Sequence, residues 1–337
     1  MEPRQTKINI IYEGKNITQD IQENMLSFNF IDNGTGLADD LQLQLQDREG
    51  LWVSSWMPQK GDRIKAEIVV LNRKYEGTEE KLNCGTFEVD TVNVSGKPDI
   101  VIIKATSIPA NSSIRRELKT KAWENVNLTQ IGRDIAGTAG LKQVLELDFD
   151  PLYDRVNQNQ QSDLSFLQQT SQKYGITTKV TDQKLVLFDE YRLEQTNPIK
   201  TLTRGDQYIL SYSFDSTLID ASYSACEVSY YDTRVRKTYL ATYKPPNAPN
   251  GPVLKLNERV SSNNEAYRLA QKSLREKNKQ AVKGKISLMG DVNLQQGLTI
   301  NVNGMGDFNG KYLIETAKHV VKDGYSTSIT IRKVLGY

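Results

Sequence analysis

The chain has 337 residues, of which 38% are hydrophobic and 25% are charged, and 43 Lys and Arg side chains nearly balance 41 Asp and Glu. This length predicts roughly two or three domains with substantial cores. The net charge of +2 argues against nucleic-acid recognition, because proteins that bind polyanions usually carry a basic excess. The two cysteines are far apart and form no disulfide framework, so we expect reduced thiols, Cys84 at a strand edge and Cys226 within a strand.

The N-terminal sequence MEPRQTKINIIYEG lacks the long apolar stretch of a secretory signal. Apolar runs elsewhere are short, with residues 100–103 as a typical case, so no membrane span is expected. The protein is therefore expected to be made and kept in the cytosol unless an assembly carries it out.

The N-terminal region is predicted to form short strands. Residues 41–46, LQLQLQ, alternate strictly, which places the leucines on one face of a half-buried strand. Similar patterns occur at residues 7–12, 63–70, 85–92 and 100–105, separated by turns rich in Gly, Pro and Asp. This arrangement predicts a sandwich or a barrel.

Residues 110–195 change in character and predict an α+β unit. A capping box at residues 127–130 precedes a helix that ends at a C-cap glycine, Gly140. A second helix is expected over residues 162–175, and a β-hairpin over residues 176–188 follows it.

Strands are expected again after residue 199. Residues 208–214 and 225–231 are rich in aromatic and β-branched side chains, which favour strands. The proline-rich residues 244–252 predict a loop, and a capping box at residues 262–265 opens an amphipathic helix. The chain ends in three predicted strands, over residues 297–302, 312–318 and 326–334.

Two distant segments share one pattern. GTFEVDT at residues 85–91 and GKYLIET at residues 310–316 both consist of glycine, any residue, an aromatic, any residue, Val or Ile, an acid and Thr. A strand led by Gly61 precedes the first segment and one led by Gly297 precedes the second, and a glycine turn and another strand follow each. Short β patterns also recur by chance, but this order favours two copies of one barrel on either side of the helical unit.

The sequence offers few residues for catalysis or metal binding. A single histidine, His319, argues against most metal sites and Ser-His-Asp arrangements, and a structural imidazole bonded to backbone is preferred over a general base. No helix is expected after residues 304–306, GMG, so they are interpreted as an ordinary loop and not as a dinucleotide turn. Acid pairs such as Asp148 and Asp150 are unavoidable among 41 acids and do not by themselves indicate a glycosidase. We expect no catalytic residue, no metal and no cofactor.

Three local clusters have competing interpretations. The basic residues within 115–121 and 234–237 are interpreted as solvated faces or inter-subunit ion pairs. Nucleic-acid binding would require interleaved aromatics, for which the tyrosines within 230–239 are the candidates. Residues 51–58, LWVSSWMP, are equally consistent with a barrel core or lid and with a surface for a partner.

Several motifs occur in a characteristic order: DREG at 47–50, WMPQKGD at 56–62, CGTFEVD at 84–90 and NQQSDLSFL at 159–167, followed by segments 297–302, 310–312, 317–319 and 324–327. Together they resemble the late control protein D family, the baseplate hub proteins of contractile-tailed phages, tailocins and related contractile injection systems. A similar fold occurs in the valine–glycine repeat protein of type VI secretion. The resemblance covers nearly the whole chain.

The resemblance implies an α+β, mainly β fold, in which two tube-like antiparallel β-barrel domains flank a smaller α+β domain. The expected boundaries are 1–109, 110–195 and 196–337, with an inserted loop and helix at about 245–295 in the last domain. It implies a homotrimer that adapts a six-fold tail tube to a three-fold central spike. The implied partners are the tail tube protein, the central spike protein and other baseplate proteins.

The resemblance also implies a non-enzymatic protein that is made in the host bacterial cytoplasm and then becomes part of the phage tail or tailocin baseplate. The sequence ends at Tyr337 without a β-helix repeat, a His-x-His tip or a lytic domain, so spike and enzyme are expected on separate chains. Two alternatives are a tail-associated peptidoglycan hydrolase and a carbohydrate-binding module.

Overall fold

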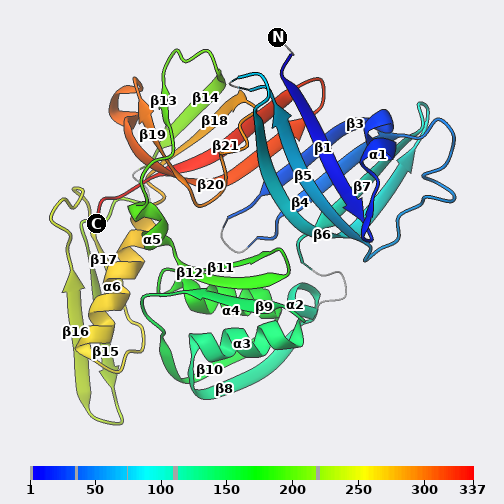
Figure 1. Ribbon diagram of the computed structural model, residues 1–337. Helices are drawn as coiled ribbons and strands as arrows, with labels where there is room; N and C mark the ends of the chain where they lie inside the picture. Colours follow the sequence, from blue (N-terminus) through cyan, green and yellow to red (C-terminus); the bar gives the residue numbers. More distant parts are fainter. Residues whose placement is uncertain (1–2, 35–36, 74, 109–112, 218–220) are drawn as a thin grey trace.

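The computed structural model describes residues 3–34, 37–73, 75–108, 113–217 and 221–337. Strands make up 49% of the structure and helices 17%, which confirms the predicted α+β class with a majority of β-structure. Figure 1 shows two sheet halves side by side, with a helical unit and a narrow sheet with one long helix below them. No helix of the described segments is long and apolar enough to cross a membrane.

The first half of the large sheet contains the N-terminal strands in the order β3-β4-β7-β6-β5-β1, all antiparallel to their neighbours. The predicted alternation in β4 is confirmed, because Leu41, Leu43 and Leu45 are all buried in one core with Phe28 and Phe30. Its elements are β1 (Gln5–Tyr12), β2 (Lys15–Asn16), α1 (Thr18–Asn24), β3 (Met25–Asp32), β4 (Asp40–Gln46), β5 (Arg63–Leu71), β6 (Glu79–Ser95) and β7 (Ile100–Thr106).

The second half has the strand order β14-β18-β21-β20-β19, again antiparallel, and β13 adds to β19 in parallel. Ile286, Ile314 and Ile331 form the centre of its core, together with the fully buried Tyr312. Its elements are β13 (Thr201–Thr203), β14 (Ile209–Ser216), β18 (Val282–Met289), β19 (Thr299–Asn303), η1 (Gly306–Phe308), β20 (Gly310–Val321) and β21 (Tyr325–Lys333).

The two halves make equivalent backbone hydrogen bonds around the shared sequence pattern. In each half, the amide of a glycine donates to the carbonyl of the buried Val or Ile of the pattern. The amide of that Val or Ile donates back to the carbonyl of the residue after the glycine. The bonds are Gly61 N to Val89 O at 2.8 Å and Val89 N to Asp62 O at 2.9 Å, and Gly297 N to Ile314 O at 3.0 Å and Ile314 N to Leu298 O at 2.9 Å. Both glycines have positive φ, 95° and 84°, which a residue with a Cβ rarely adopts.

The bulges of the two halves also coincide. The β6–β7 register shifts between Val89 and Thr91, and the β20–β21 register shifts between Ile314 and Thr316, so the acid of each pattern is the extra residue. A second pair of shifts falls within MLSFNF at residues 25–30 in β3 and within ILSYSF at residues 209–214 in β14. The duplication therefore extends to five strands.

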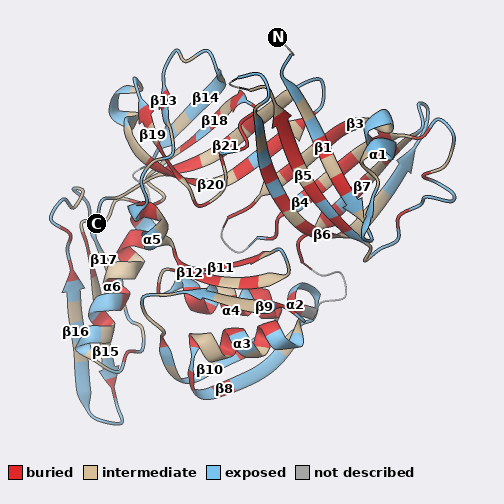
Figure 2. Cartoon of the chain, in the orientation of Figure 1, coloured by how far each residue is buried: buried red, intermediate tan, exposed pale blue. Residues whose placement is uncertain are grey.

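One strand pairing joins the halves into a single 13-stranded sheet. The end of β20, from Ala317 to Val321, pairs antiparallel with β3, from Asp32 to Phe28. Figure 2 shows buried residues concentrated on the strands of both halves, whereas β16 (Lys237–Tyr243) of the narrow sheet is mostly exposed.

The central unit packs two helices against a three-stranded sheet and a two-stranded ribbon. Trp123 and Phe166 stack in its core with ring centroids 5.1 Å apart. Its elements are α2 (Ser113–Arg116), β8 (Lys119–Asn127), α3 (Leu128–Thr138), β9 (Lys142–Glu146), β10 (Leu152–Gln161), α4 (Asp163–Gln172), β11 (Ile176–Thr181), β12 (Lys184–Asp189) and α5 (Glu190–Gln195).

One predicted helix cap in this unit is wrong. The side chain of Asn127 makes no cap hydrogen bond, and the Thr129 amide instead donates to Asp150 Oδ1 at 3.0 Å. A carboxylate distant in sequence thus accepts from a free amide of the first helical turn. The spacing of neighbouring residues cannot reveal such a contact. The predicted cap at Ser162 is confirmed, since its hydroxyl accepts from Ser165 N at 3.3 Å, and Gly140 follows α3 with a φ of 68°.

The inserted sheet consists of β15 (Ala225–Asp232), β16 (Lys237–Tyr243) and β17 (Val253–Leu256), which pack against α6 (Asn263–Asn278). Ser262 caps α6 as predicted by accepting from Glu265 N at 3.1 Å, but Glu265 Oε2 accepts from Ser261 N. Both cysteines are free and buried. Cys84 lies within β6 at the register shift opposite Ala66 and Glu67, in a stretch that pairs with β5 but not with β7, and Cys226 lies in β15 as predicted.

Candidate functional site: a charged cleft, a buried histidine and buried ion pairs

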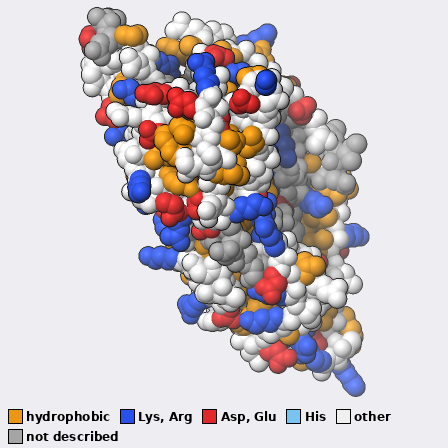
Figure 3. All heavy atoms as spheres, turned by 90° about the vertical axis from the view of Figure 1, so that its right-hand side faces the viewer, with side chains coloured by type: hydrophobic (Ala, Val, Ile, Leu, Met, Phe, Trp, Pro, Cys, Tyr) orange, Lys and Arg blue, Asp and Glu red, His pale blue; other side chains and the backbone are white. Residues whose placement is uncertain are grey.

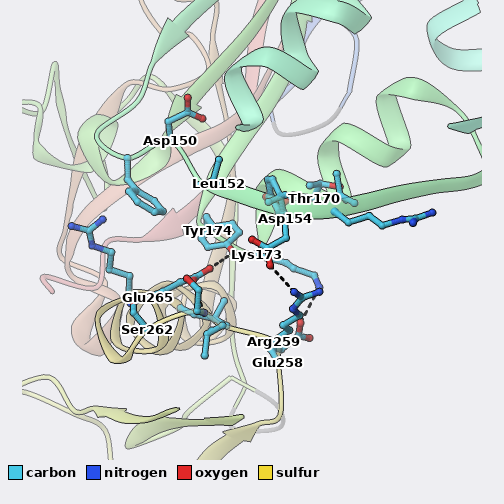
Figure 4. A pocket seen from close by; sticks show the side chains of 18 of the residues that line it. Asp150, Leu152, Asp154, Thr170, Lys173, Tyr174, Glu258, Arg259, Ser262 and Glu265 are labelled. Carbon is cyan, nitrogen blue, oxygen red and sulfur yellow. Dashed lines mark hydrogen bonds and ion pairs between the residues drawn. The ribbon is translucent and has the colours of Figure 1, made fainter. Parts of the chain in front are cut away.

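A cleft of about 640 Å³ lies between the central unit and the inserted sheet with its helix α6. β10 and α4 contribute one wall, and residues 258–269 contribute the other. Figure 4 shows that Asp154, Lys173 and Tyr174 lie opposite Glu258, Arg259, Ser262 and Glu265 across this space.

Ion pairs connect the two walls of the cleft. Asp154 Oδ2 accepts from Arg259 at 2.6 Å and from Arg234 at 3.4 Å, and Lys173 donates to Glu258 at 3.0 Å. These side chains are about half exposed, so each pair stabilises the structure by at most about 1 kcal/mol. The pairs therefore orient the inserted sheet against the central unit more than they stabilise either.

The inner part of the cleft holds neutral hydroxyl groups. Tyr174 donates to Glu265 Oε1 at 3.2 Å, and burial, together with the Glu265 charge, raises the pKa of Tyr174 well above its usual value. Burial likewise raises the pKa of Tyr153. Both phenols therefore stay protonated at neutral pH and act as hydrogen-bond donors.

The carboxylates of the cleft are all engaged in structural contacts. Asp154 and Glu258 bind cations of the opposite wall, Asp150 caps α3, and Glu265 accepts from Ser261 and Tyr174. Glycoside hydrolysis requires two carboxyl groups that flank a bound sugar and are available for proton transfer or nucleophilic attack. The hydrogen-bonding of these acids instead suits a joint between two parts of the fold.

His319 lies fully buried in β20. Its Nε2 donates to the Leu294 carbonyl at 3.1 Å, which leaves Nδ1 to accept from the Tyr325 hydroxyl at 2.8 Å. Burial lowers the pKa of His319 to about 4, so the ring is neutral at physiological pH. The predicted hydrogen bond between the imidazole and the backbone is confirmed.

A buried arginine joins three parts of the fold. Arg332 of β21 is fully buried, and its Nη2 donates to Glu190 Oε2 at 2.9 Å and to Glu194 Oε1 at 2.8 Å, both on α5. Arg275 of α6 donates to Glu194 at 2.7 Å, and Lys279, which follows α6 directly, donates to Glu190 at 3.0 Å. The second half, the central unit and α6 are thus held by one ionic network.

A second buried network joins the central unit to the sheet. Lys179 of β11 lies 2.6 Å from Asp32 Oδ1 of β3 and 3.2 Å from Asp39 Oδ1. The other oxygen of Asp32 accepts from Gln296 N of the second half at 2.8 Å. Burial raises the pKa of Asp39 to about 6, although Lys179 opposes the shift. This network fixes the point where both halves and the central unit meet.

No group of three or more His, Cys, Asp or Glu side chains that could hold a metal ion occurs within the described part of the chain. The predicted basic clusters make ion pairs within the chain, since Arg116 lies 2.6 Å from Asp90 and Lys119 lies 2.6 Å from Asp163. The aromatic cluster at residues 51–58 contains both core and surface side chains.

Trp52 belongs to the core of the first half, whereas Trp56 and Met57 are exposed. The rings of Trp52 and Trp56 meet edge to face, with centroids 5.5 Å apart. The buried indole therefore anchors a segment whose other apolar side chains remain on the surface.

Comparison with known proteins places these features in context. The family model described as YQBQ-like matches residues 116–332. The probable baseplate hub protein of Escherichia phage 186 is 27% identical over 200 residues, covering 57% of this chain and 48% of that protein. The corresponding protein of Escherichia phage P2 is 26% identical over 205 residues, covering 58% and 50%. The chain thus spans about half the length of the curated relatives it matches.

A solved structure extends the comparison to nearly the whole chain. The tail protein from Neisseria meningitidis MC58 superposes with a TM-score of 0.69 at 13% sequence identity, covering 97% of this chain and 96% of that chain. At this identity the match establishes a shared fold. The shared fold includes both sheet halves and the parts between them.

Proposed function

Because the chain belongs to the YQBQ-like family and its predicted resemblance to tail and baseplate hub proteins is confirmed, we propose that it is a structural hub subunit of a contractile-tail baseplate. In this proposal three copies form a ring that adapts the six-fold tail tube to the three-fold central spike. The tube protein, the spike protein and other baseplate proteins are its partners. The protein is made in the host bacterial cytoplasm and then incorporated into the particle.

The internal duplication is the observation that carries this proposal. Each chain presents two sheet halves with the same strand order, the same glycine hydrogen bonds and the same bulges. Three copies would therefore present six similar halves, which is the number that a six-fold tube requires. A closed ring is also the usual way in which identical subunits satisfy their interfaces.

The proposal assigns no enzymatic activity to this chain. The carboxylates of the cleft are engaged in ion pairs and caps. The single histidine of the chain, His319, is buried and neutral. These contacts favour a structural role over a peptidoglycan hydrolase.

We further propose a division of the chain into residues 1–109, 110–195 and 196–337. The separate hydrophobic cores of the first half, the central unit and the second half support this division. The inserted sheet has its own core with α6, within the last part.

Light scattering on the purified chain tests the hub assignment. The expected mass is about 114 kDa, three times the 38.1 kDa of one chain. Zymography with cell-wall substrate provides the second test, and no clearing is expected. A monomer that degrades cell wall would overturn the proposal and establish the hydrolase alternative.

A further inference from the structure

The joint between the two halves shows how this sheet continues from one repeat to the next. The end of β20 pairs with β3 in the register Lys318 to Ile31, His319 to Phe30 and Val320 to Asn29. The rings of Phe30 and His319 stack across this joint, with centroids 5.9 Å apart. The joint therefore combines main-chain pairing with a buried aromatic contact.

Each strand of this joint has an equivalent in the other half. The shared bulges align β3 with β14, so that Phe28 corresponds to Tyr212 and Phe30 to Phe214. The shared glycine pattern aligns β20 with β6, so that His319 corresponds to Val94. The repeat thus predicts a second joint, between β14 and the end of β6.

That second joint is not formed within the chain. β14 pairs with β18 on one side, and no described strand pairs with its other side. The last residues of β6 pair with β7, and β5 reaches only as far as Glu88 on the opposite side. In Figure 1, β14 lies in the left part of the large sheet, and β7, with which the end of β6 pairs, lies in the right part. The two edges are therefore apart within one chain.

Both edges expose apolar side chains. Leu210 is 60% exposed, Tyr212 is 43% exposed and Val94 is 51% exposed, although Phe28 and His319 at equivalent positions are fully buried. Figure 3 shows a group of hydrophobic side chains bordered by charges on the side that lies to the right in Figure 1, where β7 is found. An unpaired strand edge with exposed apolar residues is a template for another strand.

We infer that β14 of one copy pairs with the end of β6 of the next copy, in the register of the internal joint. This inference rests on the proposed ring of three copies and specifies its interface. It places Val94 opposite Phe214, Asn93 opposite Asp215 and Ser95 opposite Ser213. The contact is head to tail, which closes into a ring when the rotation between copies permits.

The occupant is a second copy of this chain because the internal joint already pairs the same two strand types. β3 and β14 share a bulge and the sequence pattern MLSFNF or ILSYSF. A strand that fits the edge of β3 therefore has its counterpart in the same sequence, at the end of β6.

Disulfide trapping tests the register. Ser95 and Ser213 are both exposed, and directly opposite residues of antiparallel strands have Cα atoms about 4.5–5.5 Å apart, within the range for a disulfide. We expect the double variant Ser95→Cys/Ser213→Cys to form cross-linked dimers and trimers on mild oxidation. The native cysteines are buried and their thiol pKa values are raised, so they contribute little background.

The matched control is Ser95→Cys/Ser211→Cys, in which the second cysteine is also exposed but displaced by two residues along β14. We expect at least tenfold less cross-linking in this control. When single variants are mixed, Ser95→Cys should cross-link to Ser213→Cys but not to itself, as a head-to-tail contact requires.

Three outcomes would overturn the inference. Equal cross-linking at positions 211 and 213 would contradict the register. Particles of three-copy mass without cross-links would contradict the strand pairing but leave the proposed ring intact. Monomers at every concentration, without cross-links, would overturn both the interface and the ring.

Discussion

β3 and β14 hold the same place in the two halves of the sheet, yet their surroundings differ. Each pairs with the next strand through the same bulge, but β3 is covered on its other side by β20, and β14 is open there. Phe28 is consequently buried and its equivalent Tyr212 is exposed. The difference comes from the neighbouring strand, since the two strands themselves are alike. The first half thus has the strand contact that the second half lacks.

A second difference concerns how each half is tied to the rest of the chain. Arg332 of the second half binds α5, whereas its equivalent by register, Thr106 of the first half, has a buried hydroxyl with no hydrogen-bond partner among the described residues. These ion pairs of Arg332 with α5, the ionic anchor, therefore have no counterpart in the first half. The half that has the anchor also carries the inserted sheet.

The largest expected effect follows from removing this anchor. Arg332→Met should lower the free energy of unfolding by about 3 kcal/mol, because Glu190 and Glu194 lose a buried cation. The matched Thr106→Val change in the other half should alter it by less than about 1 kcal/mol. Urea unfolding followed by tryptophan fluorescence measures both. Equal losses would contradict the assignment of the anchor to the second half.

His319 and Val94 provide the next comparison. At pH 7, His319→Gln should cost on the order of 1 kcal/mol through altered hydrogen bonds. Because the folded pKa is about 4 and the unfolded value about 6.5, the wild type binds fewer protons when folded and loses about 3 kcal/mol as pH falls from 6.5 to 4. The variant lacks this loss, so it should become the more stable protein near pH 4.

The difference between wild type and variant at each pH is the quantity to measure by urea unfolding. Asp39, whose pKa is raised to about 6, acts in the opposite sense, because the folded state then binds more protons in this range, but it acts equally in both proteins. Val94→Gln, at the equivalent exposed position, should show no such pH dependence in its difference from wild type. A constant difference for His319→Gln would contradict a neutral buried imidazole.

The last comparison concerns the open edge and affects association rather than folding. Val94→Lys places a charge where the proposed joint needs an apolar contact, and should weaken association of copies about tenfold, or about 1.4 kcal/mol. Leu118→Lys changes an apolar residue that is even more exposed than Val94 and lies away from both edges, and it should leave association unchanged. Sedimentation over a concentration series distinguishes them. An unaffected Val94→Lys variant would argue that this edge is not an interface.

Local patterns predicted most strands and the repeat. The alternation at Leu41, Leu43 and Leu45 and the caps at Ser162 and Ser262 depend on neighbours in sequence, and the structure confirms them. The similarity of MLSFNF and ILSYSF is too short to indicate a repeat by itself, and only the shared bulges show that the two segments are equivalent.

Long-range contacts were not predictable in the same way. Asp150 caps a helix that begins more than twenty residues earlier, and Arg332 binds α5 across more than a hundred residues. The cleft likewise brings Asp154 to Arg259. A period-two pattern indicates which face of a strand is buried, but not which strand it pairs with. The pattern therefore could not indicate that β15 belongs to a separate sheet.

Negative-stain imaging of the purified chain tests the central claim most directly, because it reveals the number of copies and the repeat within each copy together. We expect closed rings of three copies with six similar lobes around a central opening. Isolated particles of single-chain size at micromolar concentration, or closed pairs with two-fold symmetry, would contradict it.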